Sequence, residues 1–240
     1  MKIGGYLKTS LIDWPGKIAS VIFIPGCNFR CPFCHNSGLV DPRKIKKIRP
    51  FLEKQIFEDF KKRKKWLDGV VLTGGEPLFQ PDLEKLLRKI KQLGFKIKLD
   101  TNGSLPDKLQ PLLAQKLIDY VALDIKTTLD DQYSKAIGLK KYDPLPVKKT
   151  LNLLLKSRIP FELRTTIVPG IHDLEKLKKM AKQLKKIVSK KKINWFWQNF
   201  QPKNCLEPQF EKIKPYLQAD LEGFLKTVER FYLGVKLRAA

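Results

Sequence analysis

Three cysteines lie close together near the start of the chain, at Cys27, Cys31 and Cys34, directly after the apolar run of residues 21–24. Thiolates bind soft metals, and three of them from one short loop can converge on a single metal centre. A structural zinc site is held by four ligands, usually supplied as two pairs, so a group of three favours a centre with one open position. We exclude His35 as the fourth ligand, because adjacent residues rarely reach one ion together without strain.

The remaining cysteine, Cys205, leaves an alternative open. If it binds the same centre, the site is closed by four protein ligands. A lone distant cysteine is more often a buried apolar thiol, and this is the interpretation that we favour. A chain of 240 residues with four cysteines, three of them in one loop, does not resemble a secreted disulfide framework. The cysteines therefore indicate metal or redox chemistry in a reducing compartment.

Apolar, β-branched runs alternate with helical periodicity through most of the sequence, which predicts repeated βα units around a parallel sheet. The expected strands are residues 19–25, 69–73, 95–100, 120–125, 161–168 and 194–200. The expected helices are residues 50–66, 81–93, 106–117, 129–138, 146–158, 173–188 and 218–232.

Six βα units at this length predict an α/β protein with a partial (βα)6 TIM-like barrel, because the full eight-unit barrel needs about 250 residues. We expect a single domain with an N-terminal hairpin at 1–18, the barrel at 19–204 and a C-terminal helical extension at 205–240. An open doubly wound sheet is the alternative. Parallel strands place chemistry at their carboxyl ends, and the unusual residues of this chain follow the predicted strands.

The formal net charge of +24 comes mostly from lysines spread along the chain, on or beside predicted amphipathic helices. A solvated outer face explains them better than a nucleic-acid footprint, because no aromatic residues alternate with the basic runs. A charged protein partner stays open. No segment approaches the roughly 20 apolar residues of a membrane span, and the N-terminus lacks the apolar core of a signal peptide. We therefore expect a cytoplasmic protein with no membrane partner.

The segment Cys27-x3-Cys31-Pro32-Phe33-Cys34 resembles the CxxxCxΦC motif of radical S-adenosylmethionine (SAM) enzymes, where Φ is aromatic. A [4Fe-4S] cluster usually takes four cysteines, so three leave one iron free for an exogenous group. The resemblance implies that this iron chelates the amino and carboxylate groups of SAM, with Phe33 beside the cofactor. An electron from the cluster then cleaves the sulfonium to a 5′-deoxyadenosyl radical.

The motif TGGEP at residues 73–77 follows a predicted strand, and a tight turn is its simplest explanation. The resemblance implies instead that Gly74, Gly75 and Glu76 cradle the methionyl amino group. Asp100 ends the next strand, where it is either a cap or, by resemblance, a residue near bound SAM that acts through the ribose or a cation. A monovalent cation is therefore a further candidate cofactor.

Two charged residues, Asp124 and Lys126, end an apolar strand and need partners there. The resemblance favours Lys126 at the carboxylate of SAM, with Asp124 as a second contact. Arg164 lies in an otherwise apolar strand and must be paired or solvated. We do not expect an ion pair with Glu162, and the resemblance favours the methionyl carboxylate for Arg164 as well.

Three further polar residues follow later strands. His172 is expected to cap the next helix or to be exposed. The segment NWFWQNF at residues 194–200 predicts barrel core, and Gln198 or Asn199 is a candidate contact for adenine.

The stretch TSLIDWPGKIASVIFIPGCNFRCPFCHN closely resembles the activating enzymes of glycyl radical proteins. Within that group the chain looks most like the anaerobic ribonucleoside-triphosphate reductase activating type and is also similar to the pyruvate formate-lyase type. The implied reaction is abstraction of a hydrogen atom from a glycine of a partner protein, with electrons from a flavodoxin or ferredoxin.

Asp13, Pro15 and Gly16 are expected to shape the substrate entrance, although a plain turn explains them almost as well. Residues 37–68 contain no further cysteines, so one cluster is expected.

Two other functions stay open. One keeps the cluster and SAM but acts on a small molecule, as in enzymes that form deazapurines. The other is a non-enzymatic zinc or iron–sulfur module that binds nucleic acid through its lysines, which leaves Glu76, Asp100 and Lys126 without a purpose.

Overall fold

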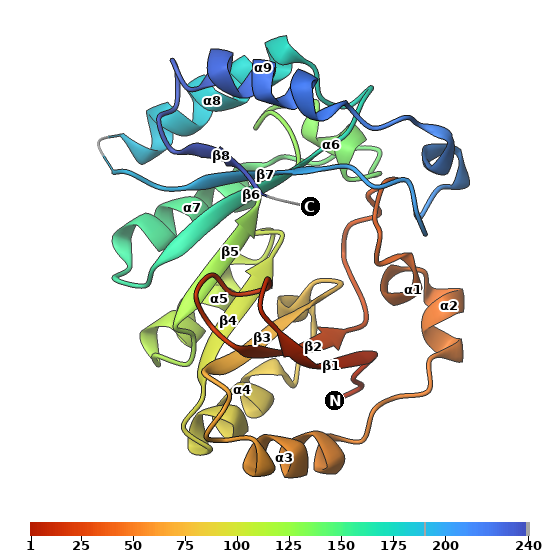
Figure 1. The fold of residues 1–240 in the computed structure, drawn as a ribbon, viewed down its shortest axis with the longest axis vertical. Coiled ribbons are helices and arrows are strands. Elements are labelled where there is room, and N and C mark those ends of the chain that lie inside the picture. Colours follow the sequence, from red (N-terminus) through yellow and green to blue (C-terminus); the bar gives the residue numbers. More distant parts are fainter. Residues whose placement is uncertain (190, 239–240) are drawn as a thin grey trace. The chain divides into compact units, whose positions relative to one another are not determined.

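The computed structural model describes residues 1–189 and 191–238, which form two compact units (Figure 1). The first unit contains residues 1–28, 36–101 and 107–122. The second contains residues 29–35, 102–106 and the described residues from Leu123 onward. The boundary passes through the cysteine loop and through one strand, β5, so both units contribute to the segments in which chemistry was predicted.

The elements of the first unit alternate between strand and helix. They are β1 (Gly5–Ser10), β2 (Ala19–Ile24), α1 (Ser37–Val40), α2 (Pro42–Lys47), α3 (Glu53–Lys62), β3 (Gly69–Gly74), the 3-10 turn η1 (Pro77–Phe79), α4 (Leu83–Gln92), β4 (Lys96–Thr101), α5 (Pro106–Ala114) and the start of β5 (Tyr120–Asp124).

The second unit continues the same alternation. Its elements are the end of β5, α6 (Tyr133–Ala136), α7 (Leu145–Lys156), β6 (Phe161–Ile167), α8 (Leu174–Val188), β7 (Trp195–Asn199), η2 (Pro208–Lys212), α9 (Gln218–Val228) and β8 (Val235–Leu237).

In the first unit the strands neighbour one another in chain order from β1 to β5. β1 is antiparallel to β2, while β2, β3 and β4 are parallel. Registered residues alternate between the two faces of these strands. One face packs on α3, where the ring of Tyr6 meets that of Phe60 at 6.0 Å. The opposite face buries Trp14 against Val21 and Val71.

The helices follow the periodicity that the sequence predicts. α4 buries Leu83, Leu86, Leu87 and Ile90, which share one face of a helix. It is followed by Gly94, whose φ of +84° suits the left-handed end of a helix. α4 therefore presents one apolar face for burial.

In the second unit the order is β5-β6-β7-β8, with β6, β7 and β8 parallel. The buried faces of β6 and β7 are held together by a chain of hydrogen bonds, in which Trp195 Nε1 donates to Thr165 Oγ1 and Thr165 Oγ1 donates to the Ile125 carbonyl. Figure 1 shows α8 and α9 running along β7 and β8. α8 starts at its N-cap Asp173, which accepts from the Lys176 N–H.

The expected α/β fold with a parallel, partial barrel is confirmed, and all six expected strands are present within one or two residues. β8 was not predicted, because three residues after Gly234 carry too little pattern to be recognised. The expected helices at 129–138 and 50–66 were too long, since the structure has helix only at Tyr133–Ala136 and Glu53–Lys62. The expectation of a single domain stays a prediction. Within the described residues, no helix combines the length and the apolar character that crossing a bilayer requires.

Candidate functional site

The cysteine loop follows the carboxyl end of β2. Cys27 lies in the first unit and Cys31 and Cys34 in the second. None of them forms a disulfide, and Cys31 is buried while the other two are half-buried. The N–H of Cys34 donates to the carbonyl of Cys31 at 3.0 Å, which closes a turn between these two thiols. Within residues 1–189 and 191–238, no three His, Cys, Asp or Glu side chains are already gathered around one metal-ion position.

The part of the loop in the second unit is held by its neighbours. The Arg30 N–H donates to the Ile137 carbonyl at 2.8 Å, and the Glu207 N–H donates to the Pro32 carbonyl at 3.0 Å. Phe33 is buried, with its ring 6.4 Å from that of Phe210. The aromatic residue of the motif therefore anchors the loop to η2, a contact that the sequence alone did not reveal.

Cys205 is a buried thiol, as the sequence interpretation favoured. Its N–H donates to Glu211 Oε1 at 3.0 Å. Burial, followed by the charges of Glu211 and Cys34, raises the pKa of the Cys205 thiol. A raised pKa disfavours the thiolate that metal binding needs.

The Gly-Gly pair brings the end of β3 onto the start of the cysteine loop within the first unit. The N–H of Gly75 donates to the Ile24 carbonyl and the N–H of Glu76 to the Gly26 carbonyl, both at 2.8 Å. A Cβ on Gly75 would collide with the Gly26 carbonyl oxygen, and Gly74 has a φ of +118°. Asn36, which follows the cysteines, donates its Nδ2 to the Gly74 carbonyl at 2.9 Å. Close backbone approach is therefore sufficient to explain both glycines, and their proposed contact with SAM stays a prediction.

Glu76 is completely buried in the first unit. Its Oε1 accepts from the Leu78 N–H at 3.1 Å and from the Thr101 hydroxyl at 2.9 Å. The carboxylate therefore begins η1 and links the end of β3 to the end of β4.

Oδ1 of Asp100 binds the ammonium of Lys98 at 2.6 Å. Lys98 is completely buried, and the sequence analysis did not single it out. In the second unit, Asn102 accepts from the N–H and the hydroxyl of Ser104. The Asn-Gly step is thus a turn supported by the Asn102 side chain.

Asp124, Lys126 and Arg164 come together in the second unit. Asp124 accepts from Lys126 Nζ at 2.9 Å and from Arg164 Nε at 2.8 Å. Burial alone would raise the pKa of the Asp124 carboxyl, but the charges of Arg164 and Lys126 outweigh it and lower the pKa to about 2. Burial alone would lower the pKa of Lys126, yet the charges of Asp124 and then of Cys31 raise it. One carboxylate therefore serves two cations in this cluster.

The fully buried carboxylate of Glu162 accepts two hydrogen bonds from Arg238, at 2.9 and 3.1 Å. The guanidinium of Arg238 also lies 4.5 Å from the centre of the Phe196 ring. Arg238 follows β8, a strand that was not predicted, so its role could not be recognised from the sequence.

The expectation for His172 was wrong, because its side chain is completely buried and Asp173 is the cap of α8. The Val168 N–H donates to its Nδ1 at 3.0 Å, so Nε2 carries the proton and donates to the Lys126 carbonyl at 2.9 Å. Burial lowers the pKa of the His172 imidazole to about 4. The neutral ring thus joins the turn after β6 to the end of β5. This role could not be predicted from a single histidine that follows Pro-Gly.

The hairpin before β2 contains Asp13, Pro15 and Gly16. Ser10 Oγ donates to Asp13 Oδ2 at 2.5 Å, and Gly16 has a φ of +68°. The hairpin precedes the first residue of β2 whereas Cys27 follows the last, so the six residues of the strand separate them by about 20 Å. A role at a substrate entrance stays a prediction for these residues.

The donor set fits the cofactors that the sequence predicts. Three thiols from one loop, none of them in a disulfide, suit an iron–sulfur cluster with an open iron position. In the second unit, Oδ1 of Asn199 is buried and has no hydrogen-bond partner among the described residues, which suits an amino group of a ligand. Asn199 donates its Nδ2 to the Tyr216 carbonyl, which fixes the orientation of the amide.

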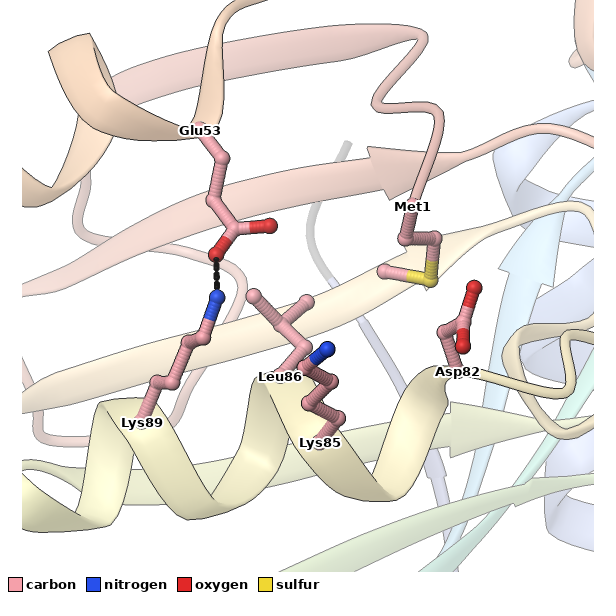
Figure 2. Close-up of a pocket in the computed structure, with 6 residues that line it drawn as sticks. All are labelled: Met1, Glu53, Asp82, Lys85, Leu86 and Lys89. Atoms are coloured by element: carbon pink, nitrogen blue, oxygen red, sulfur yellow. Dashed lines mark hydrogen bonds and ion pairs between the residues drawn. The ribbon is translucent and has the colours of Figure 1, made fainter.

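A cavity of about 100 Å³ lies between α3, α4 and the N-terminal residue (Figure 2). It is lined by Met1, Glu53, Asp82, Lys85, Leu86 and Lys89. Glu53 and Lys89 form an ion pair across it. None of the residues expected at the functional site lines this cavity, so it does not compete with the strand ends as the site of chemistry.

The model of the Radical SAM superfamily matches residues 21–196, which is more than half of the chain. The superfamily implies a [4Fe-4S] cluster and SAM as cofactors. In the solved structure of Streptococcus suis SuiB bound to its precursor peptide SuiA, the similar region gives a TM-score of 0.67 at 19% identity. It covers 92% of this chain but 48% of that one, and the likeness concerns the fold.

Two curated relatives narrow the assignment. The chain is 32% identical over 241 residues to the "Putative glycyl-radical enzyme activating enzyme" of Methanocaldococcus jannaschii, covering 98% of this chain and 95% of the relative. It is also 32% identical over 191 residues to the pyruvate formate-lyase-activating enzyme of Clostridium pasteurianum, covering 76% of each. The chain therefore belongs to the radical SAM superfamily and, within it, to the family of glycyl-radical enzyme activating enzymes.

Proposed function

We propose that this protein cleaves SAM reductively at one [4Fe-4S] cluster and abstracts a hydrogen atom from a glycine of a partner glycyl radical enzyme. The partner is of the anaerobic ribonucleoside-triphosphate reductase type, and a low-potential flavodoxin or ferredoxin supplies the electron. Such chemistry suits a reducing, cytoplasmic setting.

One observation carries this proposal. Three thiols that form no disulfide lie in the segment Cys27–Cys34 of a chain that matches an activating-enzyme relative along 98% of its length. Zinc would require a fourth ligand, and the fourth cysteine, Cys205, is buried with a raised pKa.

The cluster and SAM, when bound, supply the electron and the hydrogen-abstracting radical. Cys27, Cys31 and Cys34 hold the cluster and leave one iron position for SAM. Phe33 and its contact with Phe210 keep the loop folded around the cluster and exclude water.

The remaining predicted residues suit the two charged groups of an amino acid. In the second unit, Lys126 and Arg164 lie together at the carboxylate of Asp124, and a cluster that contains two cations suits an anion such as the methionyl carboxylate. In the first unit, the buried carboxylate of Glu76 beside the Gly74 and Gly75 backbone favours an ammonium group. Asp100 is proposed to receive the ribose hydroxyls.

Asp13, Pro15 and Gly16 are proposed to guide the loop that carries the target glycine. Glycine suits the reaction because a loop without a side chain enters a narrow site and its α-carbon radical is stabilised by the adjacent amide groups. Enzymes of the pyruvate formate-lyase type have a histidine beside the ligand near the end of the corresponding strand. The segment NFQPKNC at the end of β7 contains no histidine, which weakens the assignment to that partner and favours the reductase type.

Anaerobic reconstitution with iron and sulfide tests the first part of the proposal. We expect about four irons per chain, a reduced-cluster electron paramagnetic resonance (EPR) signal that changes when SAM is added, and formation of 5′-deoxyadenosine. Cys31→Ala should lose the cluster, whereas Cys205→Ala should keep it. A cluster signal indifferent to SAM contradicts the proposal.

The partner is tested by incubating the reduced, SAM-loaded protein with a purified anaerobic ribonucleoside-triphosphate reductase and, separately, with a pyruvate formate-lyase. A glycyl radical signal in the reductase alone is expected. A radical in the lyase alone would reassign the partner, and stimulation of SAM cleavage only by a pterin-derived small molecule would overturn the activating function.

A further inference from the structure

Lys98 is a completely buried lysine in the first unit to which the proposed chemistry gives no role. Lysine is almost never fully buried unless its charge is paired. Its Nζ lies 2.6 Å from Oδ1 of Asp100, which is itself buried. A charged pair of this kind is costly to remove from water, so it needs a reason other than stability.

The register of the strands shows where the aliphatic part of Lys98 lies. Val21 on β2 pairs with Val71 on β3, and Val71 pairs with Lys98 on β4, so the three side chains share one face. On that face Val21 and Val71 pack with Trp14 in a buried apolar cluster. The aliphatic stem of Lys98 thus extends an apolar layer. Because the side chain is fully buried, its ammonium is paired by Asp100 and not by solvent water.

The ammonium of Lys98 is directed along β4 toward its carboxyl end. Asp100 lies two residues further on the same face, and Oδ1 of its carboxylate takes the ammonium. Thr101, the next residue, donates to the buried Glu76. The end of β4 therefore carries a carboxylate whose orientation is set from within the protein.

We propose that Lys98 is a positioning residue for Asp100, acting as its built-in cation so that Asp100 receives SAM without recruiting an inorganic monovalent cation. This inference rests on the proposed function, because Asp100 acts on SAM only there. It assigns to a lysine of the chain the positive charge that a bound potassium or sodium ion would otherwise supply.

The test compares SAM binding by the cluster-loaded wild-type protein and by Lys98→Met, using equilibrium dialysis and the SAM-induced EPR change. Each is measured at one ionic strength in choline chloride, potassium chloride and ammonium chloride. The wild-type affinity should vary less than about twofold among the salts. Lys98→Met should bind SAM at least about tenfold more weakly in choline and recover part of the loss in potassium or ammonium.

Lys89→Met is the matched control. Lys89 also pairs with a carboxylate in the first unit, Glu53, but the pair lines the cavity between α3 and α4 and is partly exposed (Figure 2). This variant should bind SAM as the wild type does in all three salts. A loss equal to that of Lys98→Met would show a general effect of charge removal and would overturn the proposal.

Lys98→Met alone leaves the Asp100 carboxylate buried without its ammonium, and the variant can fail to fold for that reason. The double variant Lys98→Met/Asp100→Asn removes both charges and should unfold at nearly the same urea concentration as the wild type, while its SAM affinity stays low in every salt. Wild-type affinity in the double variant would overturn the positioning role.

Two results separate this inference from the function on which it rests. A cluster-loaded wild type that binds no SAM contradicts the proposed function itself. A wild type that binds SAM only in potassium or ammonium keeps the function but overturns the built-in cation, as does a Lys98→Met variant with normal affinity in choline.

Discussion

The ends of β4 and β5 carry the same two residue types in opposite order. On β4 Lys98 precedes Asp100, whereas Asp124 is the last residue of β5 and Lys126 follows it by two residues. The side chains pair in both cases, at 2.6 Å and 2.9 Å. In each pair the order along the chain decides which charge lies nearer the carboxyl end. β4 presents a carboxylate there, and β5 presents an ammonium.

The two pairs also differ in burial and in partners. Lys98 has no exposed side-chain area, whereas the Lys126 side chain is 20% exposed. Asp124 also binds Arg164, so two cations lie beside this one carboxylate. Reversing the order of two residues thus changes which charge lies nearer the carboxyl end of a parallel strand.

The largest expected effect compares the loss of the two aspartates. Asp100→Ala leaves a fully buried ammonium and should lower the free energy of unfolding by about 4 kcal/mol. Asp124→Ala leaves Lys126 and Arg164 side by side, but both are partly exposed and can turn to water, so about 2 kcal/mol is expected. Urea unfolding of the two variants measures the difference. Adding Lys98→Met to Asp100→Ala should restore most of the loss, and equal losses for the two aspartates would contradict the comparison.

A pH dependence distinguishes the units, because both histidines of the chain, His35 and His172, belong to the second one. Burial lowers the folded-state pKa of His172 to about 4, below its ordinary 6.5. The folded state thus favours the neutral ring, and the stability it contributes is fully present above pH 6.5 and is lost as the pH falls toward 4. The expected loss is about 3 kcal/mol.

Urea unfolding between pH 7.5 and 4 measures this loss, and His172→Gln should flatten the profile in that window. His35→Gln is the matched control. Partial burial also lowers the pKa of His35, but this residue keeps much of its surface in contact with solvent. His35→Gln should therefore change the pH profile of the unfolding free energy less than His172→Gln does. An unchanged profile in His172→Gln would show that another group titrates.

The sequence predicts the strands and the cysteine loop well because both rest on local pattern. Apolar runs of five to seven residues recur between helices, and the positions of Cys27, Cys31 and Cys34 depend on spacing alone. The same holds for the Gly74-Gly75 turn. These features needed no knowledge of what lies across the sheet.

The partners of charged residues could not be predicted, because they are set by register between strands. Lys98 looks like a surface residue in KIKLD until its pairing with Val71 places it on the apolar face. Arg238 follows a strand too short to recognise, and His172 gives no local sign that it bonds to the Lys126 carbonyl. Each would need the pairing of distant segments to be known first.

A smaller effect is expected from Arg238, which pairs with Glu162 in the second unit. Arg238→Met removes two hydrogen bonds from the fully buried Glu162 and should lower the free energy of unfolding by about 2 kcal/mol. The loss is no larger because water reaches the space that the shorter methionine leaves open. Arg238→Met/Glu162→Gln should recover part of it. A single variant as stable as the wild type would show that other groups stabilise the Glu162 carboxylate and that its pair with Arg238 adds no stability.

The smallest effect is expected from Cys205→Ala. The thiol is buried in the second unit, so removing its sulfur should cost about 1 kcal/mol of unfolding free energy. Iron and sulfide content and the SAM-dependent EPR change should match the wild type, because Cys27, Cys31 and Cys34 suffice for the cluster. The result bears on the comparison between β4 and β5, since a Cys205 thiolate bound to iron would add a negative charge to the unit that contains Asp124, Lys126 and Arg164. Loss of iron in Cys205→Ala would show that this cysteine fills the iron position that is proposed to be open.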